Sequence, residues 1–150
     1  MGELNMNHTE LSKQYFSQKF NCAQAVFAAF ASELGLNEEQ ALKICGCFGS
    51  GMRKGEVCGA CTGALMALGL KYGQSEVEDL ESKIKTNDVA QKFLDLFQKE
   101  NGSYICKELL GCDISTSQGV QYALDNNLFV EFCPKMVESA TIIAEKLLND

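Results

Sequence analysis

Cysteine and glycine are concentrated between residues 45 and 63. This stretch holds four of the eight cysteines and six of the thirteen glycines of the chain. Cysteine supplies thiolates for redox chemistry or metal ligation, and glycine lets the backbone take a positive φ or approach another group closely. A loop rich in both residues that leads into an apolar helix is typical of a functional site. The stretch therefore indicates cysteine redox chemistry or cluster binding, without naming a substrate.

Within this stretch, Cys58 and Cys61 have the Cys-x-x-Cys spacing, and Cys45 and Cys47 lie upstream. At a helix N-terminus the Cys-x-x-Cys spacing brings two sulfurs within reach and lowers the pKa of the first thiol. Four thiolates could also form a tetrahedral site for zinc or an iron–sulfur cluster. Zinc ribbons, however, use two Cys-x-x-Cys pairs at longer spacing, which disfavours a closed zinc site at residues 45, 47, 58 and 61.

The other four cysteines are isolated in the sequence, at Cys22, Cys106, Cys112 and Cys133. Taken singly, each is best interpreted as a small hydrophobic residue in a core. Three of them nevertheless share a placement with Cys58, because Cys22, Cys106 and Cys133 also fall near predicted helix starts. Helix N-termini carry positive partial charge and favour thiolates, so a reactive thiol of low pKa is expected among these cysteines.

Composition excludes several classes of function. The net charge of −7 disfavours phosphate backbones and anionic lipid surfaces, so nucleic acid is not expected as a partner. No run of about 20 apolar residues occurs, so no membrane insertion is expected. Residues 1–10 carry no apolar signal segment, which favours a cytoplasmic protein, where many cysteines indicate metal binding or catalytic thiols. The single histidine, His8, argues against Ser-His-Asp catalysis, Cys-His catalysis and mixed Cys/His zinc sites.

The elements that must position these cysteines are predicted to be helices, and no alternating strand pattern was found. We expect an all-α fold: a compact single-domain bundle of about five to seven helices over residues 1–150, with a Gly/Cys-rich loop and a flexible N-terminus over about residues 1–8. Asn21, Asn37 and Thr116 are expected N-caps, with Thr9 opening a first helix over about 10–18. The other expected helical stretches are 22 to about 34, 38 to 45, 58 to about 72, 76 to about 99, 106–110, 117–125 and 133–148.

Two of these helices carry specific expectations. Gly59, Gly63 and Ala67 lie four residues apart, which leaves one helix face nearly bare and predicts very close packing by another helix. Farther along, the sequence from Ser75 to Glu78 reads as a capping box for a long amphipathic helix, with Val77, Leu80 and Ile84 among its apolar positions. Residues 86–88 are a possible break in that helix.

Five sequence elements together resemble the C_GCAxxG_C_C family of redox-active proteins, over about residues 10–148. They are residues 21–26 (NCAQAV), 48–52 (FGSGM), 58–63 (CGACTG), 106–111 (CKELLG) and the lone Cys133. The resemblance implies a small helical protein, often encoded beside transporter genes, with a redox role. The family's four cysteines fall on Cys22, Cys58, Cys106 and Cys133, and the chain departs from the pattern by adding Cys45, Cys47, Cys61 and Cys112.

Two hypotheses follow from the resemblance and the residues. In the first, the four family cysteines converge and act by thiol/disulfide chemistry toward an unidentified redox partner. A thiolate at Cys58 or Cys22 would attack, and Cys61 is a further candidate as a resolving thiol. The alternative is an electron-transfer or metal-handling module in which the same four thiolates hold an iron–sulfur cluster, expected to be [2Fe–2S], or a soft metal ion. The resemblance also suggests a link to a membrane transporter system, and the small-residue helix face would permit a homodimer.

Overall fold

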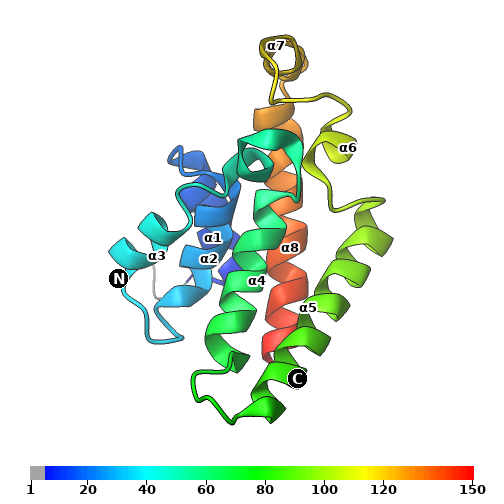
Figure 1. Cartoon of the computed structure of the whole chain (residues 1–150). Helices are drawn as coiled ribbons and strands as arrows, with labels where there is room; N and C mark the ends of the chain where they lie inside the picture. The colour runs from blue at the N-terminus through cyan, green and yellow to red at the C-terminus, as the bar shows by residue number, and fades with distance from the viewer. Residues whose placement is uncertain (1–5) are drawn as a thin grey trace.

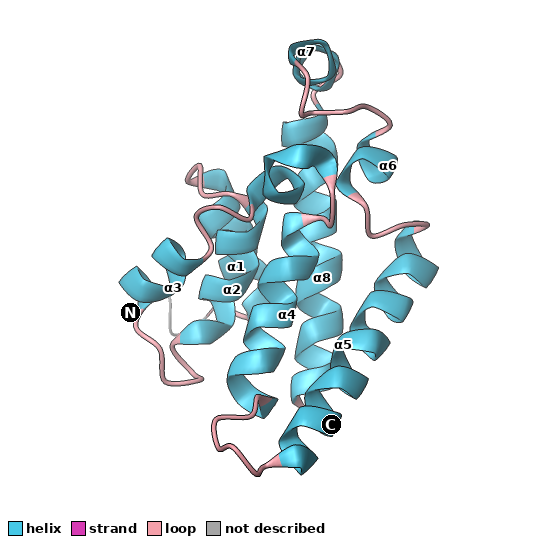
Figure 2. Ribbon diagram, in the orientation of Figure 1, coloured by secondary structure: helices cyan, strands magenta, loops and turns pink. Residues whose placement is uncertain are grey.

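A computed structural model describes residues 6–150, which are all-α. Figure 2 shows helices and loops only, and 72% of the chain is helical. Eight α-helices and two short π-type turns occur within the described residues. The α-helices are α1 (His8–Ser17), α2 (Cys22–Ala31), α3 (Glu38–Ile44), α4 (Gly59–Tyr72), α5 (Leu80–Asn101), α6 (Cys106–Leu110), α7 (Ser117–Asp125) and α8 (Cys133–Leu148), and the turns are η2 (Gly51–Gly55) and η3 (Leu128–Phe132). The all-α prediction is confirmed, and five to seven helices was too few.

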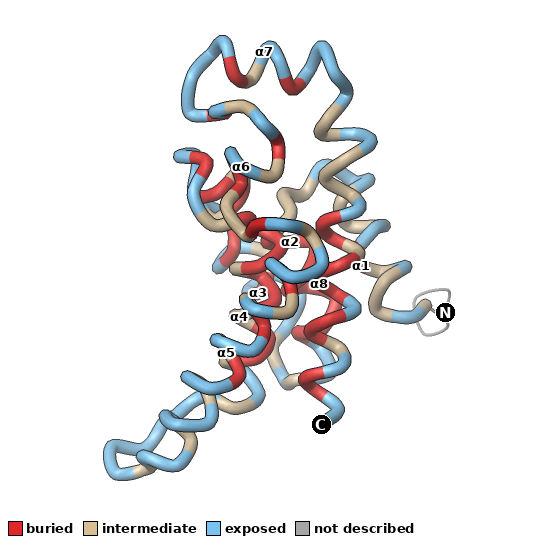
Figure 3. Tube along the Cα trace, turned by 90° about the vertical axis from the view of Figure 1, so that its right-hand side faces the viewer, coloured by how far each residue is buried: buried red, intermediate tan, exposed pale blue. Residues whose placement is uncertain are grey.

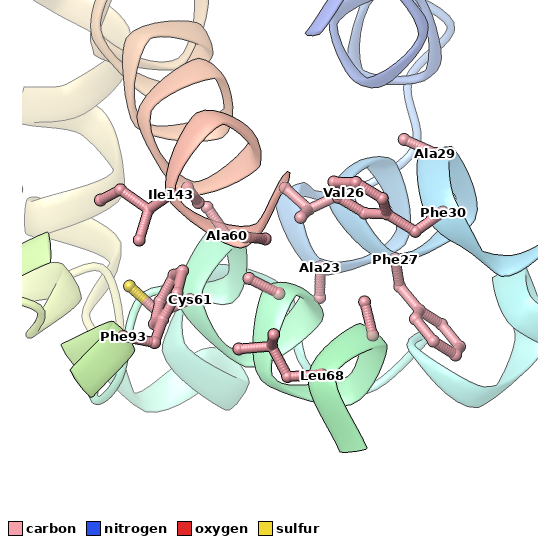
Figure 4. Close-up of a cluster of buried hydrophobic side chains, with 14 of the residues drawn as sticks. Ala23, Val26, Phe27, Ala29, Phe30, Ala60, Cys61, Leu68, Phe93 and Ile143 are labelled. Atoms are coloured by element: carbon pink, nitrogen blue, oxygen red, sulfur yellow. The ribbon is translucent and has the colours of Figure 1, made fainter. Parts of the chain in front are cut away.

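Helices α1, α2, α4 and α8 form the centre of a bundle, with α3 and α5 packed against its sides (Figure 1). The core of this bundle is apolar and includes the large side chains Phe30, Phe93 and Phe97. Figure 4 shows part of it, at the junction of α2, α4 and α8. Burial of such surfaces contributes roughly 25 cal/mol per Å² of apolar area, so this bundle is the main source of stability.

The small-residue face of α4 packs directly against α2, as predicted. A Cβ added at Gly63 would overlap the carbonyl oxygen of Ala23 and lie 3.0 Å from its Cα. A Cβ added at Gly59 would overlap the sulfur of Cys22 and lie 3.0 Å from the carbonyl oxygen of Phe48. The two helices can approach this closely because the glycines of α4 face the backbone of α2. The same contact places the start of α4 beside the start of α2.

A second, smaller hydrophobic cluster lies at the far end of the molecule from the C-terminus. We call it the cap. Its buried residues are Cys106, Leu110, Ile114 and Ala123. Around them pack Cys112, Val120, Leu128, Phe129, Phe132 and Cys133. Helix α7 lies at the top of this end, away from the main bundle, and is seen nearly end-on in Figure 1 and running across the molecule in Figure 3. The cap thus includes α6 and packs against the start of α8.

Several helix boundaries agree with the sequence. Asn21 caps α2 with the full reciprocal capping box, Asn37 caps α3, and Thr116 caps α7. Cys133 begins α8 with Pro134 in its first turn, which suits proline because its missing N–H has no partner there. The short helix α6 ends at Gly111, and α5 ends at Gly102, a left-handed residue.

Other boundaries differ from the prediction. Helix α1 begins at His8 with Asn7 as its cap, so Thr9 is inside the helix. Helix α5 begins at Leu80, because Asp79 and not Ser75 provides the capping side chain, and it continues unbroken through residues 86–88. Val77, Leu80 and Ile84 are exposed by 91%, 60% and 68%. They were expected to face the core, but this end of α5 extends beyond the bundle (Figure 3).

The structure describes residues 6–8 of the stretch that was predicted to be a flexible N-terminus. His8 is anchored: its ring stacks on Phe30 and bonds to Glu33 and Glu145. Residues 1–5, which belong to the stretch predicted to be flexible, lie outside the described residues. Over the described part of the chain, no helix is long and apolar enough to cross a membrane.

Candidate functional site

Cys22, Cys58, Cys106 and Cys133 line one cavity of about 90 Å³ between the bundle and the cap. Cys22 and Cys58 enter it from the starts of α2 and α4, and Cys106 and Cys133 from the starts of α6 and α8. The rest of the wall is largely apolar. Its other residues are Phe16, Asn21, Ser50, Gly59, Leu109, Leu110, Ile114, Phe129, Phe132 and Met136. The structure therefore brings together the four cysteines expected from the sequence.

Cys22 is held in place by the capping box of α2. The Asn21 side chain accepts a hydrogen bond from Gln24 N–H at 2.8 Å, and the Gln24 side chain accepts one from Asn21 N–H at 2.8 Å. The Asn21 amide also donates to the carbonyls of Cys45 and Gly46, both at 3.3 Å. These bonds tie the first turn of α2 to the end of α3 and fix the position of the Cys22 thiol.

Cys58 and Cys106 are held by a short pairing of two distant segments. Val57 and Ile105 form an isolated antiparallel bridge. Cys58 N–H donates to the Tyr104 carbonyl at 2.8 Å, and Cys106 N–H donates to the Glu56 carbonyl at 2.6 Å. The pairing brings the start of α6 against the start of α4, although they are almost fifty residues apart in sequence.

The loop before Cys58 contains an unusual left-handed turn. Ser50, Gly51, Met52 and Arg53 follow one another with φ between 56° and 63°. Non-glycine residues in this conformation cost roughly 1–2 kcal/mol each. The turn is closed by a hydrogen bond from Glu56 N–H to the Gly51 carbonyl at 3.1 Å. It directs the Ser50 backbone N–H to the Cys22 sulfur, where that bond favours the thiolate.

Cys22 and Cys58 are the most closely coupled pair of the site. A hydrogen bond joins their side chains, and it is the largest cause of the raised pKa of Cys22. The bond to Cys22 lowers the pKa of Cys58, but a further hydrogen bond to Cys61 and burial together outweigh it, so the net pKa is raised. Burial adds to the raised pKa of Cys22 as well. The expectation of a low-pKa thiol at Cys58 or Cys22 is therefore wrong: desolvation and thiol–thiol bonds outweigh the helix N-termini.

Cys106 and Cys133 interact with the others through charge. Burial raises the pKa of each thiol to about 12, and the negative charges of neighbouring thiolates add to this effect. For Cys106 the neighbours are Cys22 and Cys112. For Cys133 they are Cys22, Cys106 and Cys112. All four cavity cysteines are therefore neutral thiols near pH 7.

The remaining cysteines occupy different environments. Cys61 is fully buried in the bundle core, where Figure 4 shows it together with Phe93 and Ile143. It does not line the cavity, although its side chain is hydrogen-bonded to that of Cys58. Cys45 is buried with its sulfur 3.1 Å from the Met66 sulfur, whereas Cys47 is exposed. The structure therefore does not assemble Cys45, Cys47, Cys58 and Cys61 into one site.

Cys112 is a further cysteine near the site, outside the cavity lining, and the sequence did not predict its place. It packs on the cap beside Cys106 and Cys133 and is partly exposed. The only sequence signal was its position directly after Gly111, the residue that ends α6. That signal was too weak because the neighbourhood of Cys112 depends on how the cap folds onto α8.

The donor set of the cavity suits a soft metal ion or an iron–sulfur cluster by ligand type, since all four candidate ligands are thiols. The positions do not match: among residues 6–150 no group of three or more His, Cys, Asp or Glu side chains is placed to hold a metal ion. In this conformation the thiols are arranged as a hydrogen-bonded pair with two further thiols nearby. None of the eight cysteines is in a disulfide.

These features define an all-α protein with four thiols gathered in one apolar cavity. Comparison with protein families matches residues 20–147 to the family described as "Putative redox-active protein (C_GCAxxG_C_C)". The match covers most of the chain, and the protein belongs to this family. Comparisons with curated proteins and with solved structures found no match.

Proposed function

We propose that the protein is a thiol/disulfide redox protein in which Cys22 and Cys58 form the exchanging pair. The observation that carries this proposal is the hydrogen bond between their side chains inside a cavity lined by two further thiols. Two sulfurs in contact can form a disulfide with little backbone movement, provided that their Cβ atoms reach the required separation. The redox character of the family supports the proposal at a coarser level.

The proposed reaction begins at Cys58. Cys58 shares a hydrogen bond with Cys22, and the Ala60 backbone N–H favours the Cys58 thiolate. Deprotonated Cys58 attacks one sulfur of a partner disulfide, and the other partner sulfur leaves as a thiolate. Cys22 then loses its proton and attacks the Cys58 sulfur, which releases the second partner thiolate. Two electrons pass to the partner, two protons are released, and a Cys22–Cys58 disulfide remains.

The raised pKa values of Cys22 and Cys58 indicate whether the pair reduces or oxidises its partner. A disulfide is a strong oxidant when its reduced form is stabilised as a thiolate. Cys22 and Cys58 lack that stabilisation, because their pKa values are raised. Their disulfide should therefore resist reduction, and we expect a potential below about −240 mV at pH 7. The protein would then act as a reductant toward most partner disulfides.

Replacing Cys58 by serine tests the proposal. Cys58→Ser should abolish turnover of an organic disulfide such as hydroxyethyl disulfide in the presence of a recycling reductant, because the attacking sulfur is lost. Cys47→Ser is the matched control, since Cys47 is exposed and is not among the residues that line the cavity. Unchanged turnover in Cys58→Ser would remove the catalytic role from Cys58.

A second candidate is a module that holds a [2Fe–2S] cluster or a soft metal ion through Cys22, Cys58, Cys106 and Cys133. The convergence of four thiols on one cavity favours it, since disulfide chemistry needs only two. The present arrangement of the thiols counts against it, as described above. Iron and sulfide, or zinc or copper, in stoichiometric amounts in protein purified without oxygen would favour this candidate over the first. Metal-free protein that still turns over disulfides would exclude it.

A further inference from the structure

The cysteine cavity has room for only a few atoms of a substrate. Its volume is about 90 Å³, whereas sites that enclose a small organic molecule commonly measure about 300–1,000 Å³. A disulfide substrate could therefore place little more than its sulfur atoms against the four thiols. The rest of the substrate must lie in a neighbouring space, and the chemistry of that space determines which disulfides can react.

A larger groove adjoins the cavity beside the C-terminal end of α1. We call it the side groove. It measures about 560 Å³ and is lined mostly by apolar side chains of α1, of η3 and of the segment that follows α1. Phe16 and Phe129 line both the side groove and the cavity. The two spaces are therefore neighbours that share part of their walls, and the side groove has the volume of a small-molecule site.

The chain also passes twice between the two spaces. Phe20 lines the side groove, and the next residue, Asn21, lines the cavity. Cys133 lines the cavity, and the next residue, Pro134, lines the side groove. Because Cys22 directly follows Asn21, both Cys22 and Cys133 lie within two positions of a groove residue in the chain. A molecule in the side groove is therefore beside the thiols.

The side groove carries positive charge, although the chain has a net charge of −7. Among the described residues that line it, Lys13 and Lys19 are charged and none is acidic. Lys13 is paired with Glu138 at 3.2 Å. Within residues 6–150, no acidic side chain is paired with the Lys19 ammonium. Lys19 is therefore the cation of the side groove that is available to a ligand.

Lys19 also has an unusual backbone conformation. Its φ of 78° lies in the left-handed region, which glycine adopts readily and lysine rarely. Its N–H donates to the Phe16 carbonyl at 3.1 Å, just after the end of α1, where glycine commonly follows a helix. Strained residues of this kind cluster at functional sites. Backbone stability alone would favour glycine at residue 19, so the lysine side chain points to a role for its charge.

We propose that the side groove binds a small organic disulfide that carries a carboxylate, and that Lys19 pairs with this carboxylate. This inference rests on the proposed thiol/disulfide function and names its substrate class. The rings of Phe16, Phe20 and Phe129 supply an apolar surface for the methylene groups between the carboxylate and the sulfur. A single ammonium at the groove, with apolar walls leading to the cavity, suits a molecule that is charged at one end and apolar toward its disulfide.

The exchange reaction is the one proposed for the Cys22–Cys58 pair. The Cys58 thiolate bonds to one substrate sulfur, and the other substrate sulfur leaves as a thiolate. Cys22 then loses its proton and attacks the Cys58 sulfur, which releases the second substrate thiolate. Two electrons pass to the substrate and two protons leave the protein. Cys58 is only 7% exposed, so a small substrate suits this step better than a protein disulfide.

The test compares three disulfides of similar size: 3,3′-dithiodipropionate, which is anionic, bis(2-hydroxyethyl) disulfide, which is neutral, and cystamine, which is cationic. Reduced protein is mixed with an excess of each without oxygen. Timed samples are quenched and alkylated, and the Cys22–Cys58 disulfide is measured by peptide mass spectrometry. Comparing the rates of two protein variants with the same disulfide cancels the intrinsic reactivity of that disulfide.

Lys19→Gln should slow the reaction with dithiodipropionate by about fivefold or more, because it removes a charge-assisted contact. The reaction with the neutral disulfide should change by less than about twofold, and the reaction with cystamine should not become slower. Lys19→Arg should keep the rate with dithiodipropionate. Lys19→Gly lacks the charge but suits the left-handed backbone, so selective slowing in this variant at an unchanged or higher melting temperature excludes misfolding as the cause.

Lys83→Gln is the matched control. Lys83 is an exposed lysine at the end of α5 that extends beyond the bundle, so this variant loses the same charge far along the fold from the side groove. It should leave all three rates unchanged. Slowing by Lys83→Gln equal to that by Lys19→Gln would show a general effect of net charge and would overturn the inference.

The inference would also be overturned if Lys19→Gln left the rate with dithiodipropionate unchanged or slowed all three disulfides equally. These results differ from a failure of the proposed function. In that case none of the three disulfides would produce a Cys22–Cys58 disulfide in the unaltered protein, and the substrate class would be rejected together with the reaction.

Discussion

The two sides of the cysteine cavity are built differently. On the bundle side, Cys22 and Cys58 lie where α2 and α4 approach so closely that the glycines of α4 face the backbone of α2. The two thiols are joined by a hydrogen bond. On the cap side, Cys106 and Cys133 belong to a cluster with only four buried residues, and burial keeps both thiols protonated near pH 7. The bundle side is thus suited to hold a fixed pair of sulfurs. The cap side, with little buried apolar area, is suited to open and admit a partner.

The largest expected effect is a loss of stability on the bundle side. Gly63→Ala should lower the free energy of unfolding by about 2–3 kcal/mol, because the new methyl group would overlap the Ala23 carbonyl oxygen and force α2 and α4 apart. Urea denaturation monitored by circular dichroism measures this change. Gly69→Ala in the same helix is the control: nothing lies within 4 Å of its added Cβ, so it should stabilise the protein by about 0.5–1 kcal/mol. Equal stability of the two variants would contradict the close contact.

A smaller effect, confined to one side, is expected in the cap. Ile114 is 2% exposed and is one of the four buried residues of the cap. Ile114→Ala should make cap opening easier by about 2 kcal/mol. Alkylation of Cys106 and Cys133 by iodoacetamide should then become at least about tenfold faster. Alkylation of Cys61, in the bundle core, should not change.

Mass spectrometry of timed, quenched samples measures these rates residue by residue. Val130→Ala is the matched control, because Val130 lies in η3 beside the cap but is 73% exposed. Uniform acceleration at Cys61 as well as at the cap cysteines would mean that the cap and the bundle open together, and the distinction between the two sides would be lost.

The smallest expected effect concerns the end of the bundle remote from the cavity. Burial lowers the pKa of His8, but hydrogen bonds and charge interactions with Glu145 and Glu33 outweigh it, so the net pKa is raised. Stability from this interaction is therefore fully present below the unfolded-state pKa of about 6.5 and is lost as pH rises through the folded-state pKa. His8→Gln should cost about 1 kcal/mol at pH 6 and less at pH 9.

Thermal or urea unfolding at both pH values checks this prediction. Lys13→Gln, which removes an exposed pair with Glu138, should show no such difference between pH 6 and pH 9. A loss in His8→Gln that is the same at both pH values would show that stacking on Phe30, and not the charge on His8, stabilises this end of the bundle. The redox properties of the cavity should not change in either variant.

The sequence predicted features that depend on local rules. The caps at Asn21, Asn37 and Thr116 follow from side chains that bond to the first free N–H groups of a helix. The close contact of α4 follows from glycines spaced four apart, and the convergence of the four cavity cysteines followed from the family resemblance. The start of α5 was wrong because Ser75 and Asp79 both offer plausible caps, and it is the Asp79 side chain that accepts the hydrogen bond from Ser82 N–H.

Other features depend on what the folded chain brings together. The pKa of Cys58 could not be predicted from its helix start, because burial and the bond to Cys61 arise only when α4 is packed. The same reason hid the place of Cys112 beside Cys106, which depends on the cap. The exposed apolar residues Val77, Leu80 and Ile84 satisfied the helical pattern, but the pattern does not show that the end of α5 extends beyond its neighbours.

The most direct test of the account is disulfide mapping across a redox titration of metal-free protein. Samples equilibrated at defined potentials are alkylated and analysed by peptide mass spectrometry. The account predicts a single two-electron transition for the Cys22–Cys58 pair at a potential below about −240 mV, with Cys61 remaining reduced throughout. A protein in which Cys22 and Cys58 never become linked, at any potential that oxidises the other cysteines, would contradict the central claim.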